Sequence, residues 1–203
     1  EYDAVVVDEA HELADRVRSQ AAADLTVTRV SRVARSLRSN LSIDSTDLDE
    51  AGAGRAVMEL YSGAGLFSVP LARAVGETGR VATLEGEEGA VRDAGENLAA
   101  FDYWVDAFAG NVDHEGVVDL SGQLGAVPDV VVADPPRAGA GAEVCQAIAA
   151  TGTPRVVLVS CDPAAGARDL RALTEAGYQL ESLQAWDLFP HTHHVEMVSV
   201  LHR

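Results

Sequence analysis

The sequence predicts an α/β fold in which a mostly parallel sheet carries helices on both faces and includes an antiparallel terminal strand. Three observations predict this fold. Short apolar runs alternate with amphipathic segments, two of the runs (DVVVAD and RVVLVS) are rich in valine, and the last two runs have no helical segment between them. Alternating strands and helices are typical of βαβ units, which build parallel sheets. The last two strands should instead form an antiparallel hairpin at or near an edge.

Each element of this fold follows from the spacing of its apolar residues. Strands are expected at 56–61, 80–85, 104–109, 129–134, 155–160, 178–187 and 195–202. Helices are expected at 65–75, 88–100, 115–123, 141–151 and 163–176, of which the third has the weakest pattern. Towards the N-terminus, a strand is expected at 2–8 and helices at 9–22 and 26–38. The order alone also suits other Rossmann-like enzymes.

The distribution of charge divides the chain. Residues 1–38 hold six arginines against seven acids, whereas residues 39–203 hold nine arginines against twenty-five acids. The change falls in a polar, acidic stretch that contains glycine, which is typical of a boundary. We therefore expect an N-terminal segment at 1–40, a linker at 41–55 and one domain at 56–203.

The composition excludes several classes of protein. The formal net charge is −17 and no residue is a lysine, which argues against nucleic-acid binding through a broad basic face. No apolar run reaches the roughly 18 residues of a membrane span, and no signal peptide is recognisable. A cytoplasmic protein without membrane contact is therefore expected. The two cysteines are too few for a disulfide framework or for a cysteine-only metal site.

A glycine-containing turn indicates a cofactor site. Residues 59–65 read ELYSGAG and lead from a predicted strand into a helix. Gly63 and Gly65 would let backbone N–H groups approach a ligand closely. Glu85 ends the next strand about twenty residues later, where an acid can bind both hydroxyls of a ribose. Together these features indicate an adenosine-containing cofactor, although a tight turn and a solvated acid would leave the same pattern.

Two further strand ends carry candidate catalytic residues. Asp134 precedes two prolines in DPPR, which fix a rigid loop, although an ordinary strand exit is the alternative. Cys161 lies between a strand and a helix start, where a thiolate of low pKa is stabilised. The alternative for a cysteine is simple burial, which suits Cys145 within an apolar helix better than it suits Cys161.

The segment FPHTHHVE at 189–196 carries three histidines and a glutamate. The histidines suggest a metal, but no clear fourth ligand accompanies them, so no metal site is predicted. Glu196 enters the last strand and is a candidate general base.

These motifs resemble a known family. ELYSGAGLFSVPLA, DPPRAG, SCDP followed by ARDL, and FPHT followed by HVEMV occur in the order seen in TrmA/RumA-type RNA (uracil-5-)-methyltransferases. The resemblance covers about residues 57–203. It implies a class I SAM-dependent methyltransferase fold, S-adenosylmethionine as cofactor and a uridine of tRNA or 23S rRNA as substrate. No obligate protein partner is evident from the sequence.

The resemblance also implies roles for individual residues. Cys161 would attack C6 of a flipped-out uracil, so that C5 takes the methyl group, and Glu196 would then remove the C5 proton. Asp134 would lie near both cofactor and uracil. The implied cofactor-binding positions are Tyr61, Gly63, Gly65, Glu85, Asn111 and Asp134.

The N-terminal segment departs from that family. The family has an RNA-binding domain, a central region and, in many members, iron–sulfur cysteines, all of which we expect this chain to lack, with impaired activity as a consequence. Residues 2–13, YDAVVVDEAHEL, instead resemble the Walker B strand and DEAH box of a helicase. There Asp8 would hold Mg²⁺ and Glu9 would position the attacking water.

Without lysine no phosphate-binding loop of the form GxxxxGK[ST] can occur, so segment 1–40 is expected to be a helicase-like fragment and not an independent domain. Two alternatives to an active methyltransferase stay open. One is a helicase-related protein that binds ATP or nucleic acid, and the other is a catalytically silent fusion that binds S-adenosylmethionine.

Overall fold

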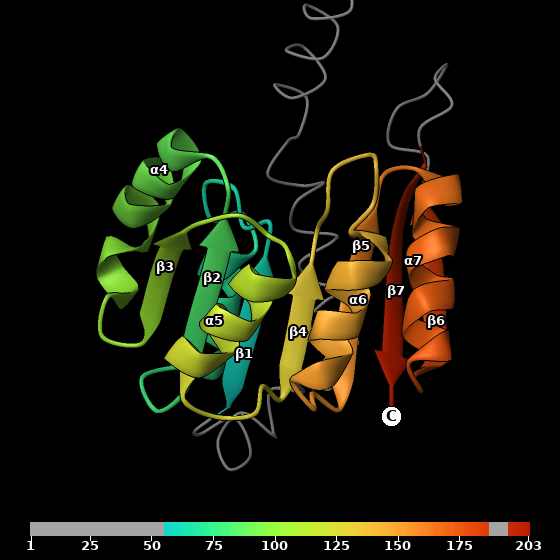
Figure 1. The fold of residues 1–203 in the computed structure, drawn as a ribbon. Coiled ribbons are helices and arrows are strands. Elements are labelled where there is room, and N and C mark those ends of the chain that lie inside the picture. The colour runs from blue at the N-terminus through green and yellow to red at the C-terminus, as the bar shows by residue number, and fades with distance from the viewer. Residues whose placement is uncertain (1–54, 187–194) are drawn as a thin grey trace, which may run out of the picture.

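The computed structural model describes residues 55–186 and 195–203, which form a sheet flanked by helices (Figure 1). The strands are β1 (Ala56–Leu60), β2 (Arg80–Glu85), β3 (Val105–Ala109), β4 (Val130–Ala133), β5 (Arg155–Ser160), β6 (Gln179–Trp186) and β7 (Glu196–His202). The helices are α3 (Ser68–Val75), α4 (Glu88–Leu98), α5 (His114–Leu124), α6 (Gly141–Ala150) and α7 (Pro163–Glu175), with a 3-10 turn, η1, at Ala99–Phe101.

The sheet has the strand order β3-β2-β1-β4-β5-β7-β6. Strands β1 to β5 are parallel, and β7 pairs antiparallel with both β5 and β6. The predicted parallel sheet and the predicted terminal hairpin are therefore both confirmed. The hairpin places β6 at the edge and β7 between β5 and β6, so the last strand of the chain lies inside the sheet.

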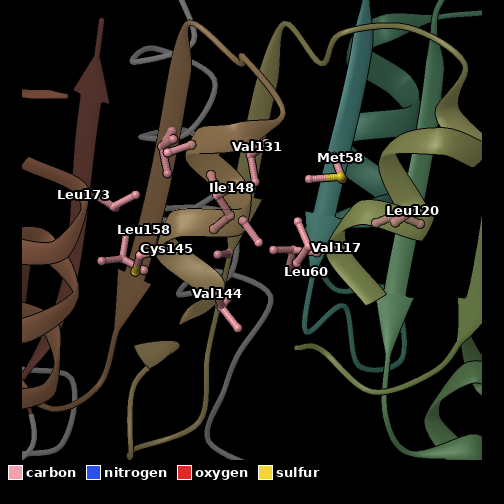
Figure 2. Close-up of a cluster of buried hydrophobic side chains, with 14 of the residues drawn as sticks. Met58, Leu60, Val117, Leu120, Val131, Val144, Cys145, Ile148, Leu158 and Leu173 are labelled. Atoms are coloured by element: carbon pink, nitrogen blue, oxygen red, sulfur yellow. The ribbon is translucent and has the colours of Figure 1, made fainter. Parts of the chain in front are cut away.

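Two buried apolar clusters lie on the two faces of the sheet. One packs α5, α6 and α7 against the strands, and Figure 2 shows part of it, including Met58, Leu60, Val117, Ile148 and Leu158. The other packs α3 and α4 against β1, β2 and β3, and it continues over valines of β4, β5 and β7. Strands β1, β4 and β5 are buried almost throughout, as expected for parallel strands covered on both faces.

The largest difference from the predicted elements is at α3, which begins at Ser68 and not at residue 65. Gly65 has a φ of +90° and Gly63 a φ of +54°. Backbone with positive φ does not continue a right-handed helix. The turn therefore extends the loop after β1 by several residues before the helix can start.

Several sequence predictions lie outside the described residues. These are the strand at 2–8, the helices at 9–22 and 26–38, the DEAH-like motif with Asp8 and Glu9, most of the linker, and the three histidines of 189–194. Within the part that is described, no helix combines the length and the apolar character needed to cross a membrane.

Candidate active site

The predicted site residues gather at the carboxyl edge of the parallel strands, where sheets of this kind bind ligands. Each of them lies at or just beyond the end of a strand, and β7 contributes because it runs in the opposite direction and starts at this edge. The residues brought to this edge are Tyr61, Gly63, Gly65, Glu85, Asn111, Asp134, Cys161 and Glu196.

Cys161 and Glu196 lie on neighbouring strands. In the β5–β7 pair, Ser160 opposes Met197, so the next residue of β5 faces the first residue of β7. Both side chains are partly buried. Val159 and Val198 belong to the cluster on the α3 face. Because side chains alternate along a strand, residues two positions away, Cys161 and Glu196, share that face.

The loop after β1 is tied to the loop after β2 by Glu85. One carboxylate oxygen of Glu85 accepts the N–H of Gly63 at 2.9 Å, and the other accepts the N–H of Glu87 at 2.8 Å. Each carboxylate oxygen keeps a further lone pair that a ribose hydroxyl could use. Glu85 therefore combines the predicted position for ribose binding with a second role that the sequence did not indicate, which is to hold the glycine loop.

The same loop is strained at Tyr61. Tyr61 has a φ of +62°, which side-chain-bearing residues rarely adopt. Its N–H donates to the carbonyl of Leu84 in β2 at 2.9 Å, and Asn97 of α4 donates to the carbonyl of Ala64 at 2.9 Å. The loop is thus fixed by neighbours on both sides, which is how a strained backbone is maintained at ligand sites.

The pKa of Asp134 is raised to about 7, first by burial and then by the negative charge of Glu196. Asp134 follows β4 directly, and its N–H donates to the carbonyl of Leu60 at 3.3 Å. The pKa of Glu196 is also raised by burial, while the guanidinium of Arg137 opposes that shift. Two carboxyl groups and one arginine therefore share this part of the edge.

The prediction that the pKa of Cys161 is low is wrong for this structure. Burial raises the pKa of the thiol, and the charges of Glu196 and Asp134 raise it further, whereas Arg137 lowers it. At the start of the following helix, the side chain of Asp162 accepts the N–H of Ala165 at 2.8 Å, so this amide is not available to a thiolate. Burial and the neighbouring carboxyl groups raise the pKa on balance, so the thiol is favoured over the thiolate.

Glu59, the first residue of the ELYSGAG motif, is a buried acid near the site to which the sequence analysis assigned no role. Its side chain is 1% exposed within β1, and one carboxyl oxygen accepts the hydroxyl of Ser68 at 2.6 Å. The other oxygen is buried without a hydrogen-bond partner. Burial raises the pKa of Glu59 to about 8, and the charge of Asp134 adds to the shift. Glu59 is therefore mainly neutral at neutral pH.

The pKa of Glu59 leads to a prediction about stability. Because the pKa of this acid is higher in the folded chain than its usual 4.5, the folded state binds more protons, and stability falls as pH rises from about 4.5 to about 8. Between about pH 6 and pH 9, the free energy of unfolding should fall by roughly 3 kcal/mol on account of this group alone. Urea unfolding at several pH values measures the loss.

Glu59→Gln should remove most of that loss, because glutamine does not ionise. The exposed Glu175→Gln is the matched control and should leave the pH dependence as in the unmodified chain. Equal pH profiles for the unmodified chain and Glu59→Gln would show that Glu59 is not the group responsible.

Three residues near the site lie in motifs that the sequence analysis quoted, but it assigned no role to them. Glu59 is a lone acid in an otherwise apolar strand, Arg137 belongs to the DPPR motif, and Asp169 belongs to the ARDL motif. Among the described residues, no group of three histidines, cysteines or acids is arranged to hold a metal.

Comparisons with known proteins find similarity to methyltransferases. Residues 123–203 match the model of the tRNA (Uracil-5-)-methyltransferase family. An uncharacterised RNA methyltransferase of Bifidobacterium longum is 45% identical over 155 residues, which make up 76% of this chain and 35% of that protein. A 23S rRNA (uracil(1939)-C(5))-methyltransferase of Acinetobacter baylyi is 37% identical over 162 residues, covering 77% of this chain and 34% of that protein.

A solved structure supports the same similarity. The tRNA (uracil-54, C5)-methyltransferase of Pyrococcus abyssi, in complex with S-adenosyl-L-homocysteine, superposes with a TM-score of 0.65 at 26% identity, covering 85% of this chain and 38% of that chain. The predicted class I SAM-dependent methyltransferase fold is thereby confirmed. The chain spans about a third of the length of the curated relatives it matches. The helicase resemblance of residues 2–13 stays a prediction.

Proposed function

The class I methyltransferase domain of this chain is similar to the catalytic part of the RNA (uracil-5-)-methyltransferases, and from this premise we propose that it methylates C5 of a uridine in RNA. S-adenosylmethionine is the proposed methyl donor. The observation that carries the proposal is the register of β5 and β7, which pairs Ser160 with Met197 and so brings the next residue, Cys161, beside Glu196. This pairing supplies a nucleophile and a base on one face of the sheet, beside the glycine loop.

Uridine needs both groups because its C5 is a poor nucleophile. In the proposed reaction the sulfur of Cys161 adds to C6, which makes C5 electron-rich. C5 then takes the methyl group, Glu196 accepts the proton from C5, and the sulfur leaves C6 as the C5–C6 double bond re-forms. The bound cofactor supplies the methyl group in electrophilic form. A uracil within a duplex or a stack must first be turned out to reach Cys161.

The resting thiol must lose its proton before it attacks. Glu196 and Asp134 both raise the pKa of Cys161, and Arg137 lowers it. A proton passed from the thiol to a neighbouring carboxylate removes one of these negative charges. The raised pKa values of Glu196 and Asp134 favour such a transfer, because burial makes both of them better proton acceptors. Glu196 and Asp134 therefore keep Cys161 protonated before substrate binds, and either of them can accept its proton when the reaction begins.

The edge also fits the proposed cofactor. The backbone of the turn at Gly63 and Gly65 has no side chain beyond Cα to obstruct an approaching ligand, and a Cβ at Gly63 would meet open space. Glu85, at the end of β2, is placed to accept ribose hydroxyls. Asn111, two residues beyond β3, is exposed and is a candidate for contact with the adenine. These residues surround the carboxyl ends of β1, β2 and β3, next to Asp134.

The direct test is methyl transfer to RNA. The chain is incubated with S-adenosylmethionine carrying a labelled methyl group and with unmodified transcripts of tRNA or of 23S rRNA, and the RNA is digested to nucleosides. The expected product is 5-methyluridine, identified by mass spectrometry, from one of the two transcripts. The two transcripts distinguish the two RNA classes.

Calorimetry with S-adenosylmethionine and with ATP distinguishes the proposed function from the two alternatives. Binding of S-adenosylmethionine without transfer to either RNA would favour a silent fusion. Binding of ATP without binding of S-adenosylmethionine would favour the helicase-related reading and overturn the proposal. A chain that transfers the label to cytidine or to protein would contradict the proposed substrate.

A further inference from the structure

Asp169 lies on the buried side of α7 and contacts the loop that follows β4. Its side chain is 2% exposed. One carboxylate oxygen accepts the N–H of Ala140 at 2.7 Å, and the other accepts the N–H of Gly141 at 2.9 Å. These amides open α6, which receives no capping bond from its own N-cap side chain. A carboxylate on one helix therefore caps the start of another through two charge-assisted hydrogen bonds.

The loop is shaped to approach this carboxylate. Gly139 has a φ of +86°, and a Cβ at this position would lie 2.6 Å from an oxygen of Asp169. Any side chain here would therefore collide with the carboxylate and strain the backbone as well. On the adjacent residue of the helix, the guanidinium of Arg168 donates to the carbonyl of Ala138 at 3.4 Å. Two consecutive residues of α7 thus form hydrogen bonds with Ala138, Ala140 and Gly141, at the end of the loop and the start of α6.

Helix α7 also begins at the loop of Cys161. Asp162 is the N-cap of the helix and Pro163 its first residue, so Cys161 lies immediately before the cap. Asp169 follows about two helical turns later. One rigid element therefore connects the loop of the candidate nucleophile with the DPPRAG loop, which bears Asp134 and Arg137.

We infer that Asp169 is a positioning residue that fixes the DPPRAG loop, and with it Arg137, relative to Cys161. This inference rests on the proposed function where methyl transfer is measured. The position of the DPPRAG loop relative to Cys161 can be tested without it. Arg137 is the residue most dependent on this anchor. Asp134 is held separately by the hydrogen bond of its N–H to Leu60 in β1.

Loss of the anchor should therefore change the environment of Cys161 in a definite direction. Arg137 lowers the pKa of the Cys161 thiol, whereas Glu196 and Asp134 raise it. Glu196 stays in place on β7 when the loop loosens, and Asp134 stays bound to β1 through its N–H, while Arg137 moves away on average. The expected result is a thiol that ionises at higher pH.

The experiment compares the full-length unmodified chain with Asp169→Asn, Asp169→Ala and the control Glu175→Gln. Glu175 is an exposed acid on the same helix that pairs only with Arg171 in the described residues. Each protein is treated with iodoacetamide across a pH series, and alkylation of Cys161 is read from its peptide by mass spectrometry. Cys145 is fully buried, so its lack of reaction in the same samples shows that the core is intact.

The midpoint of Cys161 alkylation should move to higher pH in Asp169→Asn, and further in Asp169→Ala, but not in Glu175→Gln. The kcat of methyl transfer should fall about tenfold or more, as expected when reacting groups are misplaced. The Kd for S-adenosylmethionine should change less than about threefold, because the glycine loop and Glu85 are tied elsewhere. A residue that only stabilised the fold would lower Tm and leave the alkylation midpoint and kcat unchanged.

Gly139→Ala tests the same loop with Asp169 intact. If Cys145 becomes reactive in the Asp169 variants, their core is no longer intact, and the test then depends on Gly139→Ala. It should raise the alkylation midpoint as well. Unchanged midpoints in the folded Asp169 variants or in Gly139→Ala would overturn the inference. If the unmodified chain transfers no methyl group but the midpoints shift as expected, the proposed function fails while the positioning role of Asp169 stands.

Discussion

Replacing Cys161 with alanine is expected to abolish methylation of uridine, with a loss of roughly four orders of magnitude or more, because the reaction has no other route to activate C5. Binding of S-adenosylmethionine should persist, since the glycine loop and Glu85 lie at the ends of β1 and β2. Transfer of a labelled methyl group to RNA and calorimetry with the cofactor measure these two effects separately.

The matched control is Cys145→Ala, which removes the only other sulfhydryl group. Cys145 lies fully buried in α6 and contributes to the core, so this variant should lose stability and keep its activity. The proposed mechanism would be wrong if Cys161→Ala methylated RNA at a rate near that of the unmodified chain.

Glu196→Gln is expected to stop the reaction after methyl transfer and to accumulate a covalent complex of protein and RNA. Glutamine has nearly the shape of glutamate but cannot accept the C5 proton, so the sulfur of Cys161 cannot leave C6. The complex should survive denaturation and should carry the labelled methyl group. Gel electrophoresis under denaturing conditions measures its amount, and the release of 5-methyluridine should fall at least about a hundredfold.

The label in this complex distinguishes the proposed role of Glu196 from other roles. A complex without label would mean that Glu196 acts before methyl transfer, for example as the acceptor of the thiol proton. The double variant Cys161→Ala, Glu196→Gln is the control and should form no complex. Rapid product release by Glu196→Gln would assign proton removal to another group, and Asp134, whose pKa is raised by the charge of Glu196, is a candidate.

The sequence predicted most of the fold because each strand and helix has a local pattern. DVVVAD and RVVLVS are buried strands flanked by turn residues, and they become β4 and β5. The ends of these strands and of β1 and β2 then place Asp134, Cys161, Gly63 and Glu85 at one edge. The grouping of these residues follows from the topology of a parallel sheet, which is why it could be predicted without coordinates.

The properties of the site that depend on distant contacts could not be predicted. The partners of Asp169 lie 28 and 29 residues away along the chain, so no local pattern reveals them. The pKa of Cys161 is raised by burial and by the charges of Glu196 and Asp134, although the helix start suggested a thiolate of low pKa. Glycine is an unfavourable residue within a helix, yet a Cβ at Gly166 of α7 would meet Met197 at 2.8 Å and Ser160 at 3.0 Å. Close packing of α7 on the sheet therefore favours glycine at this position.

The position of β7 inside the sheet has a consequence for the order of events during protein synthesis. The ribosome adds the residues of β1 to β5 first, and the nascent chain then holds the cofactor loops and Cys161 but has no Glu196. The nucleophile and its base come together only when β7 pairs with β5, so a nascent chain that ends before residue 196 carries a nucleophile without its base. Such a chain could form an adduct with a uridine but could not release it. Of the two acids that raise the pKa of Cys161, only Asp134 is already present at that stage, and its charge disfavours the reactive thiolate until the last strand is in place.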